Sequence, residues 1–349
     1  MTPSILRALR IAGFALMAAI PAKSFAATID APAWSAYKGA FLENSGRIID
    51  TGNGNISHSE GQGYGMWLSV LADNPADFEL IWSFTKTELL VRNDGLAAWK
   101  WDPQANPHIT DINNATDGDI LIAYALALAA QQWNRSDYQQ TARTIIDTIA
   151  QKAVIQNAGR TLLLPAVEGF SSSERADGPV INPSYLIFEA FPVFDALSPS
   201  PVWQALTNDG VALLDSFSFG DRKLPADWVS MKRRPQPAEG FAPEFGYNAV
   251  RIPLYLAQAK AGTAALYNRL LTGMSADNGN IATIDLRQNA VKDTLSDPGY
   301  RIVAAIAACA ANGTKIPEDL RSFSPTLYYP STLHLLALSA ATQTHRECL

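Results

Sequence analysis

Acidic side chains stand at the start of two strongly apolar segments of this chain. Asp117 and Asp119 open the segment ATDGDILIAYALALAAQQW at 115–133, which turns uniformly apolar after them. Glu60 lies in SEGQGYGMW, where another apolar segment begins. Acids at a helix N-terminus are commonly explained by the free N–H groups and the helix dipole there. Two such starts favour a second explanation, in which buried helices present their acidic first turns to a solvent-filled opening.

Paired carboxylates on an aromatic-rich surface are typical of glycoside hydrolysis. One acid protonates the leaving oxygen, and a second carboxylate serves water or the sugar. The ATDGD segment with its closing Trp133, together with SEGQGYGMW, resembles the signatures of glycoside hydrolase family 8. The resemblance extends from about residue 30 to about residue 345 and is greatest to bacterial endoglucanases encoded beside cellulose synthase. It implies a secreted, inverting endo-β-1,4-glucanase that acts on cellulose, with a possible association with a cellulose synthase complex.

The composition fits one large domain that acts on a neutral polymer. The chain has 349 residues, 48% of them hydrophobic, and its glycines and prolines are scattered rather than gathered in a linker. It has no basic stripe, which argues against a nucleic-acid partner. Its four histidines, at 58, 108, 334 and 345, are dispersed and form no metal-binding motif. We therefore predict no metal and no cofactor.

Residues 1–26 are predicted to be a secretory signal peptide, which leaves 27–349 as a single catalytic domain. Arg7 and Arg10 supply a positive start, an apolar run too short to span a bilayer follows, and Ser24-Phe25-Ala26 ends the segment with small residues at the cleavage positions. Cleavage would remove three of the 27 basic residues and none of the 33 acidic ones, lowering the net charge from −6 to −9. Export would permit a disulfide between Cys309 and Cys348. Because Cys348 is next to last and terminal tails are usually loose, the sequence leaves that pairing open.

Helical periodicity dominates the chain and predicts an all-α fold. Two short strand-like pieces, at 96–101 and 160–167, interrupt the pattern. Functional residue types recur at the helix starts Glu60, Asp117, Ser184 and Asn248, which are 57, 67 and 64 residues apart. That spacing is close to one helix pair plus loops, so these starts should converge at one mouth of a closed ring. This agrees with the (α/α)6 barrel that the resemblance implies. The predicted helices cover 34–46, 60–73, 75–91, 117–134, 136–153, 183–195, 201–217, 246–260, 262–274, 297–312 and 331–343, with a short one after 317.

The resemblance assigns roles to the two leading acids. Glu60 matches the proton donor of the family, a role that needs a raised pKa, and Tyr64 and Trp67 could supply an apolar wall for it. Asp117 matches an essential aspartate, which we interpret as positioning the distorted sugar and stabilising the transition state. Asp119 is two residues further on and faces another way, so a capping or supporting role is expected for it.

The catalytic base is where the chain departs from its family. Many members carry Tyr-Asp-Ala-x-Arg, whose aspartate activates water, whereas this chain has Tyr247-Asn248-Ala249-Val250-Arg251. An asparagine cannot act as the base. Asp117 could replace it, or a loop acid could, either Glu244 or Glu239; weak activity is the third alternative. An inverting pair should lie roughly 6.5–9.5 Å apart to admit water.

Aromatic and polar residues are expected to bind the sugar chain. Trp99 and Trp101 alternate in an extended segment, so they point to opposite faces, and Trp99 is the predicted platform. Tyr185 matches a family tyrosine near the cleavage site, and Trp228 is another candidate. Tyr64, Tyr247, Asn248 and Arg251 complete the predicted substrate-binding set, while residues 232–234 form a solvated basic loop.

Three rival functions remain at this point. Within the family, chitosanase, xylanase or mixed-linkage glucanase activity is possible. A polysaccharide lyase could use the same fold with a Tyr/His or Tyr/Arg base. A weakly active glucan-binding component of a cellulose export system is kept open by Asn248.

Overall fold

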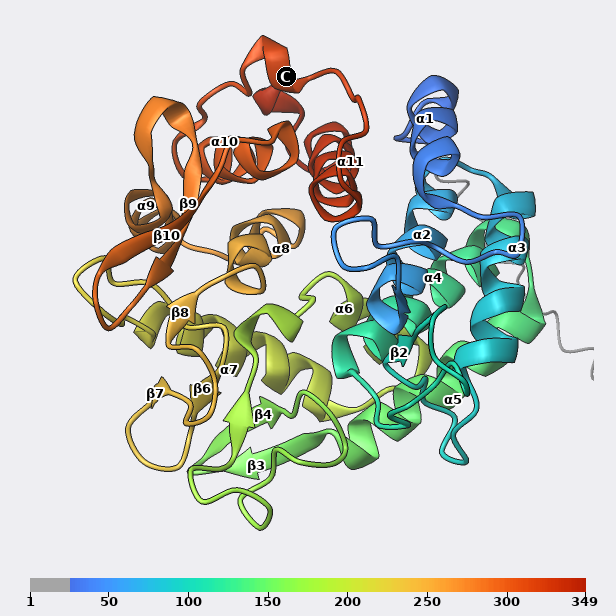
Figure 1. Ribbon diagram of the computed structural model, residues 1–349, viewed down its shortest axis with the longest axis horizontal. Coiled ribbons are helices and arrows are strands. Elements are labelled where there is room, and N and C mark those ends of the chain that lie inside the picture. Colours follow the sequence, from blue (N-terminus) through green and yellow to red (C-terminus); the bar gives the residue numbers. More distant parts are fainter. Residues whose placement is uncertain (1–25) are drawn as a thin grey trace, which may run out of the picture.

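The computed structural model describes residues 26–349, which form an inner group of helices surrounded by an outer layer (Figure 1). The inner helices are α2 (Ser59–Leu71), α4 (Thr116–Trp133), α6 (Ala190–Leu197), α8 (Ile252–Gln258), α10 (Pro298–Asn312) and α11 (Tyr328–Gln343). The outer helices are α1 (Ala31–Phe41), α3 (Pro75–Phe84), α5 (Ser136–Lys152), α7 (Pro201–Ser216) and α9 (Ala264–Met274). The predicted (α/α)6 barrel is confirmed, while the predicted signal peptide lies outside the described residues except for Ala26.

Short helical turns and β-strands occupy the connections. One π-helical turn, η1 (Thr85–Leu89), extends α3, and the 3-10 turns are η2 (Pro183–Tyr185), η3 (Ala249–Arg251), η4 (Asp277–Gly279), η5 (Glu318–Leu320) and η6 (Arg346–Cys348). Antiparallel pairs are formed by β1 (Ser57–His58) with β2 (Lys100–Trp101) and by β3 (Val154–Asn157) with β4 (Arg160–Leu163). Two antiparallel three-stranded sheets contain β5 (Val180–Ile181), β6 (Val229–Ser230) and β7 (Gln236–Pro237), and β8 (Glu244–Phe245), β9 (Ile281–Asp285) and β10 (Ala290–Leu295).

The burial of each helix follows its sequence pattern. Every residue of α4 from 116 to 127 is buried, as its uniformly apolar sequence requires at the centre of the barrel. By contrast, α5 buries only a stripe, formed by Tyr138, Ala142, Ile145, Ile146 and Ile149. That spacing places the buried side chains on one face of a helix and leaves the rest polar. The inner and outer layers are therefore distinguishable from the sequence.

Two predicted helices differ from the structure, and one hairpin in the structure was not predicted. The helices predicted at 183–195 and 246–260 begin as the 3-10 turns η2 and η3, and their α-helical parts begin only at Ala190 and Ile252. Side chains cause the interruptions: Asn182 accepts the Ser184 N–H at 3.1 Å, and Asp227 accepts the Ala249 N–H at 2.9 Å. The β9–β10 hairpin was not predicted, because β9 is buried almost throughout and lacks a clear alternation.

The C-terminal end is fastened to the barrel by a disulfide. Cys309 of α10 is bonded to Cys348, with their Cα atoms 5.7 Å apart. The backbone supports the same contact, because the Ile316 N–H donates to the Cys348 carbonyl at 2.8 Å. The pairing that the sequence left open is therefore present, and the tail is not loose.

A buried carboxyl group at Glu189 should make stability depend on pH. Glu189 lines a cavity of about 70 Å³ between the inner helices. Within residues 26–349, its Oε1 atom is buried and has no hydrogen-bond partner. Burial raises the pKa of Glu189 from its ordinary value of 4.5 to about 8.

Replacing Glu189 by Gln is expected to flatten the pH dependence of stability. Between these two pKa values the folded protein holds a proton that the unfolded chain has lost, so the wild-type free energy of unfolding falls as pH rises. The limit for one proton is about 1.4 kcal/mol per pH unit. Denaturant unfolding at a series of pH values, compared between wild type and Glu189→Gln, measures the difference. Parallel curves for the two proteins would show that Glu189 is ionised in the fold.

Candidate active site

The N-terminal ends of α2, α10 and α11 and the turn η3 meet at a pocket of about 450 Å³. Glu60, Asn248 and Arg251 line it, as do Asp50 and Tyr247 from flanking loops. Of the four helix starts predicted to converge, Glu60 and Asn248 line the pocket, and Asp117 is bonded to the lining residue Arg251. Ser184 is not among the lining residues.

Two glycines allow α2 and α4 to approach closely enough to bring their acids together. A Cβ atom on Gly118 would lie 2.0 Å from the Ser59 hydroxyl oxygen and 2.8 Å from the Glu60 nitrogen. A Cβ atom on Gly63 would lie 2.5 Å from that of Leu121. The glycines of SEGQGYG and ATDGD thus permit contact between helices whose first turns carry Glu60 and Asp117.

Arg251 joins the two acids. Its guanidinium group donates to Glu60 Oε2 at 2.5 Å and to Asp117 Oδ2 at 2.8 Å. Arg251 and Asp117 have only 2% of their side chains exposed, whereas Glu60 has 19%. Glu60 therefore faces the pocket, and Asp117 lies buried behind Glu60 and Arg251, outside the pocket lining.

The two carboxyl groups share one proton near neutral pH. Burial, together with the neighbouring Glu60 carboxylate, raises the pKa of Asp117 to about 8. Burial alone would raise the pKa of Glu60 as well, but Arg251 and His58 lower it. Close carboxyl groups cannot both ionise freely, so the pair titrates as a unit. One guanidinium charge then balances one carboxylate charge, and the remaining proton is held by Asp117. The raised pKa that the sequence-based assignment requires of Glu60 is therefore not found in this structure, because Arg251 and His58 stabilise the ionised form of Glu60.

His58 and Asp50 fix the entrance to α2. His58 Nδ1 accepts the Gly61 N–H at 2.9 Å, which caps the helix. That contact leaves Nε2 as the protonated nitrogen, which donates to Asp50 Oδ2 at 3.3 Å. Asp50 is therefore a second carboxylate in the pocket lining beside Glu60, and it approaches from the loop before α2.

Asn248 takes the place of the family's base and is held by another acid. Its Nδ2 donates to Asp227 Oδ2 at 3.3 Å, and Asp227 Oδ1 accepts the Gly246 N–H at 2.8 Å. Asp227 is only 4% exposed. The carboxylate thus lies under Asn248, caps the start of η3 and keeps Arg251 at the end of that turn.

The loop acids proposed as bases lie outside the pocket lining. Glu244 is on β8 and forms an ion pair with Lys292. Glu239 is exposed, and its backbone N–H donates to Asp177 at 2.8 Å. It lines a separate hollow beside the basic loop at 232–234. Glu244 would have to leave Lys292 to serve a water in this pocket.

The aromatic residues divide into surface and core members. Tyr185 is half-buried, with its ring centroid 5.8 Å from Arg251 Cζ. Its ring packs edge-on against that of Trp228, with the two ring centroids 6.3 Å apart. Trp228 in turn stacks on Phe241 at 4.4 Å, so these rings form a continuous aromatic wall. Tyr247 is 47% exposed at the pocket rim.

Tyr64, like Trp99 and Tyr185, is a member of the predicted substrate-binding set that is not among the residues lining the pocket. It is fully buried, and its hydroxyl bonds to that of Tyr255 beneath Arg251. Trp67 is also buried and packs against Tyr124. Tyr64 therefore supports the floor of the pocket and does not reach its surface.

The two tryptophans of the extended segment face different surroundings. Trp101 donates to Glu88 at 3.2 Å and packs against Phe84 and His108. The Lys100 ammonium lies over the Trp99 ring, 5.3 Å from its centroid, and the Trp99 indole N–H donates to Asp111 at 2.9 Å. Trp101 is thus the packed tryptophan, while the platform role of Trp99 stays a prediction.

Sequence reasoning missed Asp50, Asp227 and the tyrosine of α11 that closes the pocket, Tyr329. Tyr329 donates to the Tyr247 carbonyl at 2.8 Å and so links α11 to the rim. Asp50 lies eight residues before His58, and Asp227 directly precedes Trp228. No spacing rule relates either acid to Glu60, because separate loops bring them in.

An inner group of helices whose N-termini present acids, with one arginine between them, defines a helical-barrel glycoside hydrolase. The chain belongs to glycosyl hydrolases family 8, whose sequence pattern matches residues 7–343. It is 33% identical over 316 residues to a probable endoglucanase of Novacetimonas hansenii, covering 89% of this chain and 90% of that one. It is 39% identical over 236 residues to an endoglucanase of Cellulomonas uda, covering 67% of this chain and just under two thirds, 65%, of that relative.

Solved structures support the same assignment. The endo-β-1,4-glucanase CMCax from Acetobacter xylinum aligns with a TM-score of 0.79 and 32% identity, covering 91% of this chain and 98% of that one. A GH8 endo-β-1,4-glucanase from an Achatina fulica gut metagenomic library aligns equally well, with a TM-score of 0.79, 34% identity and 89% and 97% coverage. The sequence-based identification of a family 8 glycoside hydrolase is confirmed.

Proposed function

We propose that the protein is an endo-β-1,4-glucanase that hydrolyses internal bonds of cellulose with inversion. The observation that carries this proposal is the Glu60–Asp117 pair, which shares one proton over Arg251 at the wall of an open pocket. The proton that Asp117 holds can pass through Glu60, which faces the pocket, to a glycosidic oxygen. The endoglucanase names of the relatives set the substrate class.

The geometry favours a positioning role for Asp117. Asp117 and Glu60 lie on the same side of the pocket, joined through Arg251. A nucleophile or base must approach the sugar from the face opposite the acid. Asp117 therefore stabilises the sugar and holds the shared proton, while the water is activated by a carboxylate from a loop.

A substrate panel tests the proposal. Carboxymethylcellulose, xylan, chitosan and mixed-linkage glucan are incubated with the enzyme, and reducing ends are measured. We expect the highest rate on carboxymethylcellulose, with a rapid fall in viscosity as internal bonds break. A preference for another polymer would overturn the cellulose assignment, and a product absorbing near the ultraviolet edge would identify a lyase.

The protein is exported, and it trims cellulose during cellulose synthesis or export. The predicted signal at 1–26 and the Cys309–Cys348 disulfide support an oxidising location. No helix within residues 26–349 has the length and apolar character needed to cross a bilayer. Mass spectrometry of periplasmic or secreted protein tests cleavage after Ala26, and an intact N-terminus would contradict it.

A further inference from the structure

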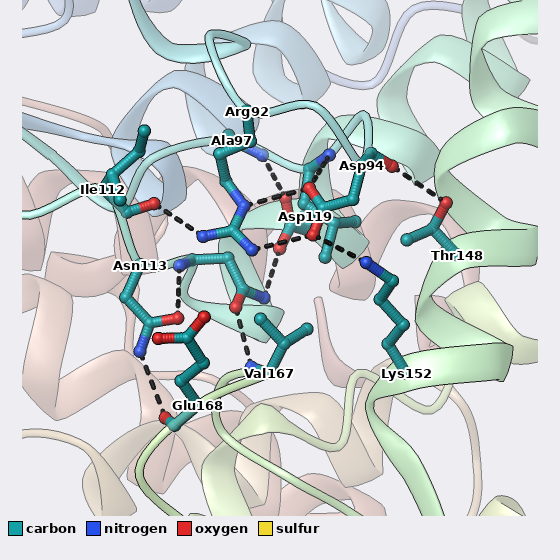
Figure 2. A network of polar contacts seen from close by, with 12 residues as sticks. Arg92, Asp94, Ala97, Ile112, Asn113, Asp119, Thr148, Lys152, Val167 and Glu168 are labelled. Carbon is teal, nitrogen blue, oxygen red and sulfur yellow. Dashed lines mark hydrogen bonds and ion pairs between the residues drawn. The ribbon is translucent and has the colours of Figure 1, made fainter.

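Asp119, the second acid of the ATDGD segment, has no place in the pocket, yet it is almost completely buried. Only 1% of its surface is exposed. Its Oδ1 accepts the Ala97 N–H at 2.8 Å, and its Oδ2 accepts a hydrogen bond from Asn114 Nδ2 at 2.8 Å. Asp119 thus does not cap its own helix but fastens two other segments of the chain to it, as Figure 2 shows for Ala97.

Those two segments hold Trp99 between them. The Trp99 backbone N–H donates to the Asn113 carbonyl at 2.9 Å, and its indole N–H donates to Asp111 at 2.9 Å. Ala97 lies two residues before Trp99. Asn114 directly follows Asn113, whose carbonyl accepts the Trp99 N–H. The backbone and the ring of Trp99 are therefore both fixed by the segments that Asp119 clamps.

The same segment is bonded to the start of α2. The Ser59 N–H donates to the Trp99 carbonyl at 2.9 Å, and Ser59 directly precedes Glu60. One short path of hydrogen bonds therefore leads from Asp119 through Trp99 to the proton donor.

A second set of charges braces the clamp from outside (Figure 2). Arg92 donates to the Ile112 carbonyl at 2.6 Å and pairs with Asp94 at 2.7 Å. Lys152 of α5 reaches the same Asp94 at 3.2 Å. These contacts restrain the loop at 111–114 independently of Asp119, so loss of the Asp119 bonds should displace the segment at 96–101 without unfolding the region.

We propose that Asp119 is a positioning residue that sets the Trp99 ring as a sugar-stacking platform beside Glu60. This inference rests on the proposed function, because it presupposes a glucan chain in the pocket. A pyranose stacks on an aromatic ring only when the ring lies at a defined height and tilt. A carboxylate that accepts one bond from each flanking segment supplies that restraint, and no neutral side chain of this size accepts two such bonds with two oxygens.

The experiment measures binding rather than turnover. Affinity for cellohexaose is determined by calorimetry in a Glu60→Gln background, which prevents cleavage. Asp119→Asn should weaken binding about tenfold. The new amide NH₂ group replaces one of the two acceptor oxygens, so either the Ala97 N–H or the Asn114 amide N–H faces another donor and loses its hydrogen bond. Trp99→Ala should weaken binding by at least as much, and adding Asp119→Asn to it should cause no further loss.

A reciprocal exchange separates positioning from general stability. The double variant Asp119→Asn with Asn114→Asp places the amide on α4 and the carboxylate on the loop. Each buried donor, including the Val167 N–H that Asn114 accepts at 2.8 Å, then regains an acceptor. We expect the double variant to recover wild-type affinity. Asp137→Asn, at the exposed start of α5, is the matched control for loss of an acid and should bind normally.

Two results would overturn the inference. One is an Asp119→Asn protein that has a lower melting temperature but the same affinity for cellohexaose as its parent. The other is an exchange variant that folds but does not regain affinity for cellohexaose. Reducing-end release by the wild type is assayed in parallel. Tight, Asp119-dependent binding without any cleavage would remove the proposed enzymatic function and leave the positioning role intact.

Discussion

Replacing Glu60 by Gln is expected to abolish hydrolysis of carboxymethylcellulose, with a loss of roughly 10²–10⁴-fold if Glu60 is the general acid. Glutamine keeps an oxygen that can accept the Arg251 hydrogen bond. It cannot deliver a proton to a departing sugar. Because the side chain is of similar size and 19% exposed, the fold should tolerate the change. Reducing-end assays and thermal melts of both proteins measure the two effects.

The leaving group provides a sharper form of this test. Dinitrophenyl cellobioside releases dinitrophenolate, a stable anion that departs without protonation. Glu60→Gln should therefore cleave this substrate at a rate much closer to that of the wild type. Glu43→Gln is a matched control, because Glu43 also pairs with an arginine, Arg47, at 2.8 Å but lies away from the pocket. A Glu60→Gln protein that retains more than half the wild-type rate on cellulose would remove Glu60 from the mechanism.

Most of the helices could be predicted from the local sequence, because burial and helical periodicity are properties of contiguous residues. The uniformly apolar α4 and the striped α5 could be assigned to the inner and outer layers on that basis alone. The helix boundaries at η2 and η3 could not be predicted in this way. At η3, the side chain that interrupts the helix is Asp227, which accepts the Ala249 N–H from 22 residues earlier in the chain. The β8–β9–β10 sheet was missed for a similar reason, since one of its strands comes from a distant loop.

The site divides in the same way. Glu60, Asp117 and Arg251 lie in helix starts with recognisable motifs, so their convergence followed from the topology. The close contact between the acids depends on Gly118, whose absent side chain leaves space for Ser59. The glycine is visible in the motif, but the neighbour it accommodates is not. Asp50 could not be predicted as a pocket residue, because its position is set by its bond to His58 and by the fold of its loop.

The identity of the catalytic base is the question that the sequence left between Asp117 and Glu244. Asp117 is unsuited to it by geometry, since it adjoins the acid through Arg251 and shares a proton with it. Glu244 is engaged by Lys292 outside the pocket lining. Asp50 lines the pocket from a separate loop, and His58 orients its carboxylate. Within the described residues, two carboxylates line the pocket, Glu60 and Asp50. Asp50 is therefore the candidate for the base.

Asp50→Ala is therefore expected to lower hydrolysis by roughly 10²–10⁴-fold, the contribution of a general base, and azide should restore much of the rate. A small anion can occupy the space of the lost carboxylate and attack the anomeric carbon from the face opposite Glu60. Because an inverting displacement on a β-glycoside gives the opposite configuration, the product should be an α-glycosyl azide, identified by NMR. Asp50→Asn, which keeps an acceptor for the Gly52 N–H bonded at 3.1 Å, controls for distortion of the loop and should be inactive but well folded.

Asp117→Asn should be impaired without rescue, because azide cannot replace a group that positions the sugar. Rescue of Glu244→Ala, with Asp50→Ala left unrescued, would assign the base to the loop before η3 and show that Glu244 leaves Lys292 when the substrate binds.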